Sequence, residues 1–319
     1  MAEISHSVVI CTQARSQDFE TLMSCLNEIA RTVSIQLVVV ANSSLLEDNN
    51  LVEATLKNYN EFEGKIYLEG PPGLPRSRNL AKPYLLGKYV TFLDDDTEVT
   101  SSYFQAIEKL FESDSEIVGA APYIEVDPLM WNRGTPKRKR LSRCKKSAGN
   151  ISRSGKFSWI EYAEGYHLVK WLPGCAMSYR WDALQMIDFN LDLENGVTGG
   201  YALGEDADYS MRMAKIGKLV GIASEIVFHK ISPVNRASAV QMEIARGSWL
   251  AYLTKKFPSQ FNSSAVIFRL ILNFIAIFLG VRTKSGLSRM SFKNGSLRIR
   301  GFVNEKRHPK LTSENLLCK

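Results

Sequence analysis

The sequence predicts an α/β protein built on a doubly wound sheet. Short, β-branched segments recur from the N-terminus onward, and segments with apolar residues at helical spacing separate them. Such alternation is typical of parallel strands joined by helices. The chain has 319 residues, of which 45% are hydrophobic, so it can bury one large core and carry an extension.

Five segments are predicted to be strands: 7–11, 36–41, 65–68, 89–93 and 117–121. Apolar residues recur at helical spacing in 19–29 and again in 103–111, where Ser101 or Ser102 is the expected N-cap. The resulting β-α-β-α-β order supports the doubly wound sheet.

The second half of the same domain is expected from 157 to 235. It contains WLPGCAMSYR, a short helix from Trp181, a turn at Gly199 and Gly200, a helix opening at Glu205 and two strands ending in His229. Between the halves, residues 127–157 are polar and basic, with eight Lys or Arg residues in 133–146, and we expect a long mobile loop there.

A helical extension is expected over 236–319. Its segment 265–281 is 17 residues of strong apolarity, at the lower limit for crossing a bilayer. Arg269 and Asn273 interrupt it four residues apart, on one helix face. This pattern favours a helix that lies in a membrane interface, or packs on the domain or in a dimer interface, over a free span.

Composition indicates a cellular compartment but does not distinguish between functions. The net charge of +7 suits anionic lipid, sugar-nucleotide phosphates and nucleic acid about equally. Five scattered cysteines without C-x-x-C spacing indicate neither a disulfide framework nor a zinc site. The first residues lack the pattern of a secretory signal, so we expect a cytoplasmic protein.

The sharpest motif is FLDDDTEV, in which an apolar strand runs into Asp94, Asp95 and Asp96. Adjacent carboxylates raise one another's pKa unless a cation lies among them. Asp94 and Asp96 point the same way from a strand and can converge on Mg²⁺ or Mn²⁺ at the carboxyl end of the sheet. The alternative is an acidic surface turn that caps the next helix.

A second acidic motif is GEDADYSMRM, which places Glu205, Asp206 and Asp208 in the first turn of a helix. Capping of the helix N-terminus can explain one of these carboxylates, but it explains three less readily. A carboxylate at this place can act as general base on an acceptor hydroxyl.

These motifs, in this order, resemble family 2 of the inverting glycosyltransferases, which have the GT-A type nucleotide-sugar fold. The resemblance covers about Ser7 to Pro233. It rests on a first strand ending near Thr12, then VVVANSS, PPGLPRSRNLA, LDDD, WLPGCAMSYR, GEDADYSMR and the histidine of VFHKISP.

The resemblance assigns roles to both acidic motifs. LDDD corresponds to the family's D-x-D motif, which implies Asp96 as metal ligand, Asp94 near the ribose or the metal, and Asp95 at the variable middle position of the nucleotide-sugar site. Asp206 takes the position of the catalytic base, and Glu205 would contact the acceptor. The implied cofactor is Mn²⁺ or Mg²⁺.

The resemblance also implies a nucleotide site. The residues that would border the nucleotide are Thr12, Asn42, Gly73, Arg76, Arg78 and Asn79. Two guanidiniums beside a Gly-containing turn suit a diphosphate, although an ordinary solvated helix face explains the arginines equally well. Related sequences often carry an acidic residue where this chain has Ala41 and Asn42, so the base of the nucleotide is not inferred.

Three further residues complete the predicted site. His229, at the end of an apolar strand, can reach the metal or the leaving diphosphate, or can be a structural hydrogen-bonding group. Gly174 and Cys175 are expected to shape the acceptor side, where glycine allows close backbone approach. Cys175 lacks a histidine nearby in sequence, which argues against a nucleophile.

The expected function is therefore sugar transfer from a nucleotide diphosphate to a glycan or lipid-linked acceptor. The domain of 1–235 would divide into a nucleotide-sugar half, about 1–125, and an acceptor half, about 157–235. The basic loop and the apolar helix give two membrane signals, so we expect peripheral attachment at the inner face of a membrane.

Two other function classes stay open on the sequence. A metal-dependent enzyme acting on nucleic acid or nucleotides would also use DDD beside a basic stretch, but that stretch lacks interleaved aromatic residues, so no nucleic acid is expected as partner. A non-catalytic membrane scaffold would not require both acidic motifs. A sugar nucleotidyltransferase and a dehydrogenase are disfavoured, because this sequence lacks the glycine-rich loop that each of them requires.

Overall fold

The computed structural model describes residues 4–13, 16–126, 145, 147–193, 203–230, 238–278 and 292–307. The chain divides into two compact units. The first unit comprises the described residues of 1–150, 158–189 and 206–235. The second unit comprises those of 151–157, 190–205 and 236–319, so two short segments from inside 1–235 belong with the C-terminal extension.

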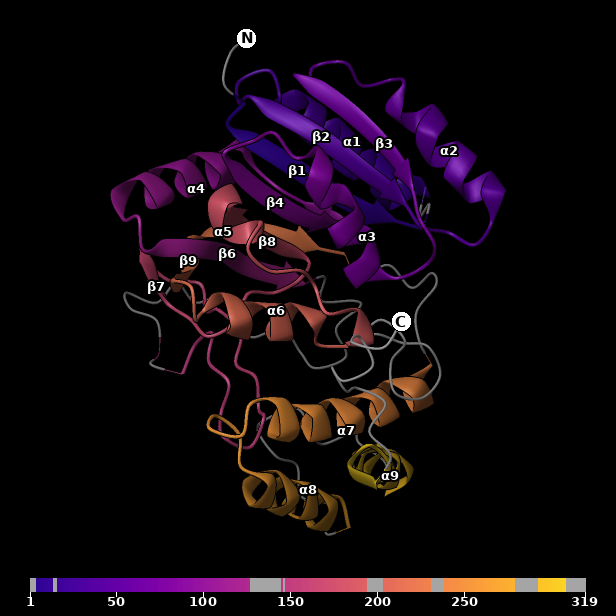
Figure 1. Ribbon diagram of the computed structural model, residues 1–319, viewed down its shortest axis with the longest axis vertical. Helices are drawn as coiled ribbons and strands as arrows, with labels where there is room; N and C mark the ends of the chain where they lie inside the picture. Colours follow the sequence, from indigo (N-terminus) through magenta and orange to yellow (C-terminus); the bar gives the residue numbers. More distant parts are fainter. Residues whose placement is uncertain are drawn as a thin grey trace. The chain divides into compact units, whose positions relative to one another are not determined.

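The first unit is built on one mixed sheet (Figure 1). Its strands are β1 (His6–Thr12), β2 (Ile35–Ala41), β3 (Gly64–Glu69), β4 (Tyr89–Asp94), β5 (Thr97–Glu98), β6 (Ile117–Val126), β7 (Tyr166–Leu168), β8 (Ala176–Arg180) and β9 (Lys218–His229). The order is β3-β2-β1-β4-β8-β6-β9-β5, and β7 pairs with β9. Strands β1 to β4 are mutually parallel, whereas β8 runs antiparallel to β4 and β6. The predicted doubly wound mixed sheet is confirmed.

Helices cover both faces of this sheet because its central strands are apolar on both sides. They are α1 (Ser16–Ile29), α2 (Leu46–Leu56), α3 (Leu74–Ala81), α4 (Ser101–Ser113), α5 (Trp181–Leu184) and α6 (Glu205–Met213), with a 3-10 turn at Lys82–Tyr84. Alternate residues of β1 enter separate cores: Val8 belongs to the core that includes Leu22 of α1, and Val9 to the core that includes Tyr209 of α6.

Two local predictions were wrong. The N-cap of α4 is Thr100, in extended conformation, and Ser101 is already helical. The two strands expected before His229 are one strand, β9. Its pairing with β6 shifts register between Pro122 and Tyr123, which skips several β9 residues, so the polar interruption in the sequence is an irregularity inside a continuous strand.

Parts of the expected loop 127–157 are ordered. Residues 127–144 and 146 lie outside the described residues, as do Gly199 and Gly200. Residues 147–149 form a turn, and Ile151 pairs with Phe157 in an antiparallel bridge. Between these two, the N–H of Gly155 donates to the carbonyl of Ser152 at 2.8 Å, so this end of the loop is a tight turn.

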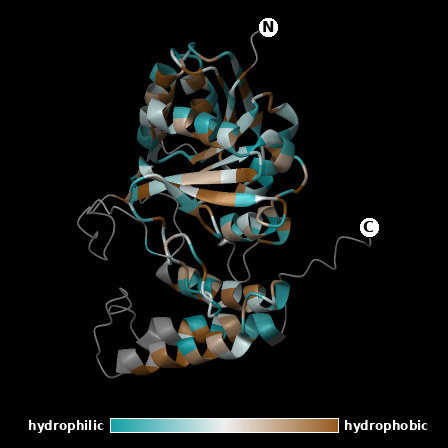
Figure 2. Cartoon of the chain, turned by 90° about the vertical axis from the view of Figure 1, so that its left-hand side faces the viewer, coloured by the Kyte–Doolittle hydropathy of each residue, from teal (hydrophilic) through white to brown (hydrophobic). Residues whose placement is uncertain are grey.

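The second unit is helical. Its helices are α7 (Ala239–Lys256), α8 (Ser263–Phe278) and α9 (Phe292–Arg307), with a 3-10 turn at Leu191–Leu193. A capping box between Ser238 and Gln241 begins α7. The helices carry both hydrophobic and hydrophilic residues (Figure 2). Within the described ranges, none has the length and apolarity that crossing a bilayer requires.

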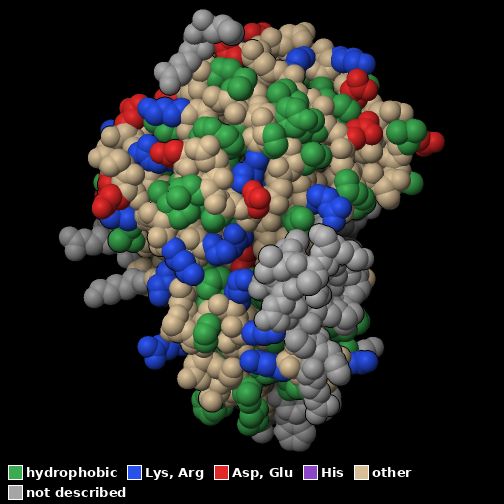
Figure 3. Space-filling model, in the orientation of Figure 1, with side chains coloured by type: hydrophobic (Ala, Val, Ile, Leu, Met, Phe, Trp, Pro, Cys, Tyr) green, Lys and Arg blue, Asp and Glu red, His purple; other side chains and the backbone are tan. Residues whose placement is uncertain are grey.

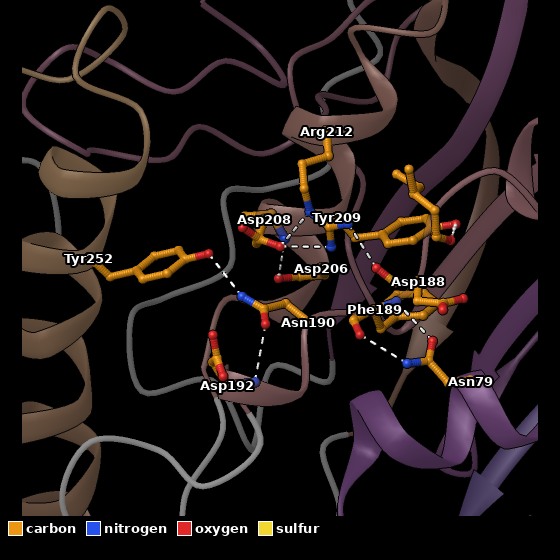
Figure 4. A network of polar contacts seen from close by, with 12 residues as sticks. Asn79, Asp188, Phe189, Asn190, Asp192, Asp206, Asp208, Tyr209, Arg212 and Tyr252 are labelled. Carbon is orange, nitrogen blue, oxygen red and sulfur yellow. Dashed lines mark hydrogen bonds and ion pairs between the residues drawn. The ribbon is translucent and has the colours of Figure 1, made fainter. Parts of the chain in front are cut away.

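Glycines let α7 and α9 pack closely. A Cβ atom on Gly247 would lie 2.0 Å from the carbonyl oxygen of Arg298, and one on Gly301 would lie 2.2 Å from that of Ile244. The segment of residues 190–205 joins α7 by side chains: Asn190 donates to the Tyr252 hydroxyl at 3.1 Å (Figure 4). This hydrogen bond ties Asn190 to α7, in agreement with its place in the second unit.

Candidate active site

Three parallel strands of the first unit end at the same edge of the sheet, where β1, β2 and β4 finish with Thr12, Ala41 and Asp94. The side-chain hydroxyl of Thr12 donates to Asp95 Oδ2 at 2.6 Å, and both residues are buried. The N–H of Asn42 donates to the carbonyl of Thr12 at 2.9 Å. The carboxyl edge is therefore held together by the residues that follow its strands.

Asp94, Asp96 and His229 converge at this edge. One ligand atom from each lies within 4.8 Å of the others, and His229 Nε2 is 3.0 Å from Asp96 Oδ1. The short strand β5 brings them together, because Thr97 pairs with His229. The carboxylate of Asp96 is fully buried, whereas the Asp94 side chain is 30% exposed. Two carboxylates and one imidazole form a donor set that Mn²⁺ or Mg²⁺ accepts.

The sequence did not reveal that His229 and Cys175 are neighbours. Burial lowers the pKa of His229, but Cys175 and the Asp96 carboxylate raise it by more, to about 11, so a metal ion that this imidazole coordinates must displace its proton. Burial raises the pKa of the Cys175 thiol in spite of a hydrogen bond with His229. The raised pKa of the Cys175 thiol disfavours the thiolate that a nucleophilic role needs, even with a histidine beside it.

Arg78 of α3 is buried, with a side chain only 2% exposed, and lies between the end of β4 and the loop before β8. Its Nη2 lies 3.8 Å from Asp94 Oδ1 and donates to the carbonyl of Gly174 at 3.0 Å. The guanidinium also lies 5.3 Å from the ring centre of Phe189. The same nitrogen, Arg78 Nη2, thus contacts both Asp94 of the acidic motif and the backbone of Gly174.

The other residues of the PPGLPRSRNLA motif differ in exposure. Gly73 is the N-cap of α3 and has a φ of 146°, a conformation that favours glycine. Arg76 on the same helix is exposed. Asn79 has both ends of its amide bonded to the backbone of Phe189, at 2.9 and 2.8 Å (Figure 4). Asn79 therefore holds the backbone of Phe189 in place beside α3.

Asn42 has a similar anchor, because its amide donates to the hydroxyl of Ser77 in α3 at 2.8 Å. Its Oδ1 is buried and has no hydrogen-bond partner among the described residues. Asn42 therefore keeps an acceptor beside the end of β2.

Asp206 is fixed by backbone N–H groups. Gly174 donates to Asp206 Oδ2 at 2.9 Å, and Ala207 donates to Oδ1 at 2.7 Å. A Cβ atom on Gly174 would lie 3.0 Å from Asp206 Cβ and 3.3 Å from Arg78 Nη2. A side chain at position 174 would therefore press on Arg78 and Asp206, which glycine avoids.

The remaining carboxylates of the second motif are buried. Glu205 is the first residue of α6. Asp208 accepts from Arg212 Nε at 2.8 Å, and Arg212 Nη1 donates to the carbonyl of Asp188 at 2.7 Å (Figure 4). The i, i+4 spacing of Asp208 and Arg212 is a sequence signal for this ion pair. Asp208 is therefore a structural acid.

Residues 7–161 match the model of glycosyl transferase family 2. These residues, which are just under half of the chain, carry a family 2 glycosyltransferase domain. The protein is a glycosyltransferase, and its fold is of the GT-A type. A search of curated protein sequences gave no match.

Solved structures share the glycosyltransferase's fold at low identity. The mannosyltransferase PcManGT from Pyrobaculum calidifontis, in complex with GDP-Man and Mn²⁺, is 12% identical with a TM-score of 0.57, over 94% of this chain and 86% of that chain. Residues 1–349 of TarS from S. aureus, in complex with UDP-GlcNAc, are 13% identical with a TM-score of 0.54, over 94% and 81% of the two chains.

The structure of the glycosyltransferase brings the predicted residues into two groups. Asp94, Asp96 and His229 meet at the carboxyl edge, and Gly174 joins Arg78 to Asp206. Sequence reasoning missed Phe189 and Asp188, which hold Asn79 and Arg212. No sequence pattern predicts these two residues, because they make the contacts with backbone atoms, to residues far away in the sequence.

Proposed function

We propose that the glycosyltransferase holds Mn²⁺ or Mg²⁺ with Asp94, Asp96 and His229 and transfers a sugar from a nucleotide diphosphate to an acceptor hydroxyl. The observation that carries the proposal is the convergence of these three side chains at the carboxyl edge of the sheet. A bound divalent cation would supply charge stabilisation to the leaving diphosphate. The exposed part of Asp94 is the side from which a ligand can approach.

Asp206 is the proposed general base. It takes the proton of the acceptor hydroxyl while the acceptor oxygen bonds to the anomeric carbon and the bond to the diphosphate breaks. This single displacement inverts the anomeric centre. The two N–H groups from Gly174 and Ala207 fix the carboxylate in one orientation, which a base needs in order to meet its proton. Glu205 and Cys175 are assigned to the acceptor side.

The nucleotide-sugar site is assigned to the ends of β1 and β2 and to the start of α3. Thr12 and Asp95 form its floor, and Asn42, Gly73 and Arg76 are the groups that face the donor. Arg78 is assigned to orienting Asp94, because its side chain is nearly inaccessible. The GDP-Man and UDP-GlcNAc complexes of the two similar structures support a nucleotide-sugar donor.

A melting experiment tests this function. The purified protein is heated with UDP-, GDP-, dTDP- and CMP-sugars, each with and without Mn²⁺ or Mg²⁺, because a ligand of the folded state raises the midpoint. We expect one donor to raise it only with metal, in the wild type and in Asp206→Asn but not in Asp96→Ala. No shift with any donor in the presence of metal, or an equal shift in Asp96→Ala, would overturn the proposal.

The acceptor is proposed to be a glycan or a lipid-linked molecule at the inner face of a membrane, which the protein would contact peripherally. Eight basic residues in 133–146 and the exposed apolar side of α8 support this placement.

A further inference from the structure

Helix α8 has two contrasting sides. Val266 and Leu270 are buried within the second unit. Five large apolar residues on the helix, Ile267, Phe268, Ile271, Leu272 and Ile275, are between 44% and 61% exposed. Their spacing of one, four, five and eight residues places them on one side of the helix. A contiguous apolar row of this size on a surface marks a contact with another body.

Among the described residues of helices α7, α8 and α9, the exposed charged side chains are all cationic. Helices α7, α8 and α9 carry nine Lys and Arg residues but only two acidic ones, Glu243 and Glu305. Both acids are buried, and Glu243 is paired with Arg246 and Arg298. Where the burial of these three helices is described, the exposed cations are Lys255, Lys256, Arg300 and Lys306. On the face that Figure 3 draws, the charged side chains of this unit are mainly Lys and Arg. An anionic surface complements such a charge distribution.

Arg269 lies at the boundary between the two sides of α8. It is half-buried, and its Nε is buried without a hydrogen-bond partner among the described residues. Burial and the nearby Arg298 lower its pKa to about 10. A guanidinium that is partly desolvated next to a second cation is unfavourable unless an anion compensates it. The part of the chain that the structure describes provides no such anion for Arg269.

We propose that the apolar side of α8 docks on an anionic phospholipid surface, with Arg269 binding a headgroup phosphate. The inference rests on the proposed function only in placing the acceptor at a membrane. An arginine at the edge of an apolar helix side keeps its stem in the apolar layer and its head among phosphates, as in helices that lie in a membrane interface. A second copy of the chain is a poorer occupant, because a two-fold contact would set the basic rims of both copies against each other.

Sedimentation with vesicles tests the docking surface on the full chain. Phosphatidylcholine vesicles are compared with vesicles that also contain phosphatidylserine, at low and high salt. The wild type is expected to bind the anionic vesicles, and Phe268→Ser/Ile271→Ser to bind at least tenfold more weakly. Arg269→Gln is expected to lose most of the preference for anionic vesicles, and Arg269→Lys to keep part of it. Val240→Ser, which changes an exposed apolar residue of α7, is the matched control.

Three outcomes overturn the proposal: wild-type protein that stays in solution with anionic vesicles, a Phe268→Ser/Ile271→Ser variant that binds as tightly as wild type, or a dimer that this variant abolishes without any vesicle binding. The metal-dependent melting shift with the donor is measured on the same samples. Loss of vesicle binding with that shift intact would contradict only the lipid surface, whereas vesicle binding without any donor shift would contradict only the glycosyl-transfer assignment.

Discussion

The two acidic motifs look alike in sequence, yet their carboxylates have different partners. In the 94–96 motif, Asp95 accepts from a threonine hydroxyl and Asp96 lies against an imidazole. In the second motif, Asp206 accepts from two backbone N–H groups and Asp208 from a guanidinium. The first arrangement gathers ligand atoms around one point, and the second holds single carboxylates in place.

This difference separates a cation site from a base. Asp94 and Asp96 come from a strand end and the turn that follows it, so their side chains can share one ion with His229. Asp206 and Asp208 follow each other around a helix, so each meets its own partner. Equal substitutions in the two motifs should therefore have different consequences.

The largest expected effect is the loss of turnover in Asp96→Asn and Asp206→Asn. Removing a general base costs roughly 10²- to 10⁴-fold in rate, so Asp206→Asn should lower turnover by that factor while keeping the metal-dependent melting shift with the donor. Asp96→Asn should lose both turnover and shift. Product formation and melting midpoints are measured on the same preparations.

Glu47→Gln, on the exposed side of α2, removes the same charge away from both motifs and should change neither quantity. If Asp206→Asn abolished the donor shift as well, Asp206 would belong to the donor site, and the division between the motifs would be wrong.

The sequence predicted the sheet well, because its strands are buried on both faces and read as continuous apolar runs. The five predicted segments lie within β1, β2, β3, β4 and β6. The prediction of two strands in place of β9 was wrong because a register irregularity places polar residues inside this strand. A turn between two strands gives the same local sequence pattern. The prediction of the α4 N-cap failed because three consecutive residues, Thr100, Ser101 and Ser102, are of types that cap helices, and Ser is preferred over Thr.

The site was less predictable from the sequence. The sequence anticipated that Asp94 and Asp96 converge, but it assumed a continuous strand, whereas β4 ends at Asp94 and Asp96 lies in the turn that follows. The approach of His229 depends on the pairing of β5 with β9. The contact of Gly174 with Asp206 joins backbone and side-chain atoms 32 residues apart, and the residue types alone carry no trace of it. Roles for Asn79 and Asp208 became clear only from their partners.

The next largest effect concerns stability. Asp208→Ala removes the acceptor of Arg212 from a fully buried position, which should lower the free energy of unfolding by about 2–3 kcal/mol. Urea unfolding measures the loss. The folded variant should keep the metal-dependent donor shift, and Glu47→Ala serves as the exposed control. A stable Asp208→Ala protein without donor binding would make Asp208 part of the site.

A smaller effect is expected for Gly174→Ala. The added Cβ would press on Asp206 Cβ and on Arg78 Nη2, at 3.0 and 3.3 Å, and would displace the carboxylate. We expect turnover to fall about tenfold, since small misplacements of a catalytic group are costly, with the KM for the donor little changed. Gly64→Ala is the matched control, because its Cβ would meet only Gln36 Cγ at 3.9 Å. Equal losses in both variants would show a general packing defect.

The smallest effect should come from Thr12→Val, which keeps the side-chain shape but removes the 2.6 Å hydrogen bond to Asp95. The free energy of unfolding should fall by about 1 kcal/mol, since one donor to a buried carboxylate is lost. Thr12→Ser keeps the hydroxyl and should retain most of that stability in urea unfolding. If Thr12→Ser lost as much as Thr12→Val, the methyl group would be the part of Thr12 that matters. Asp95 would then be held by other contacts, and the first motif would resemble the second in relying on several separate donors.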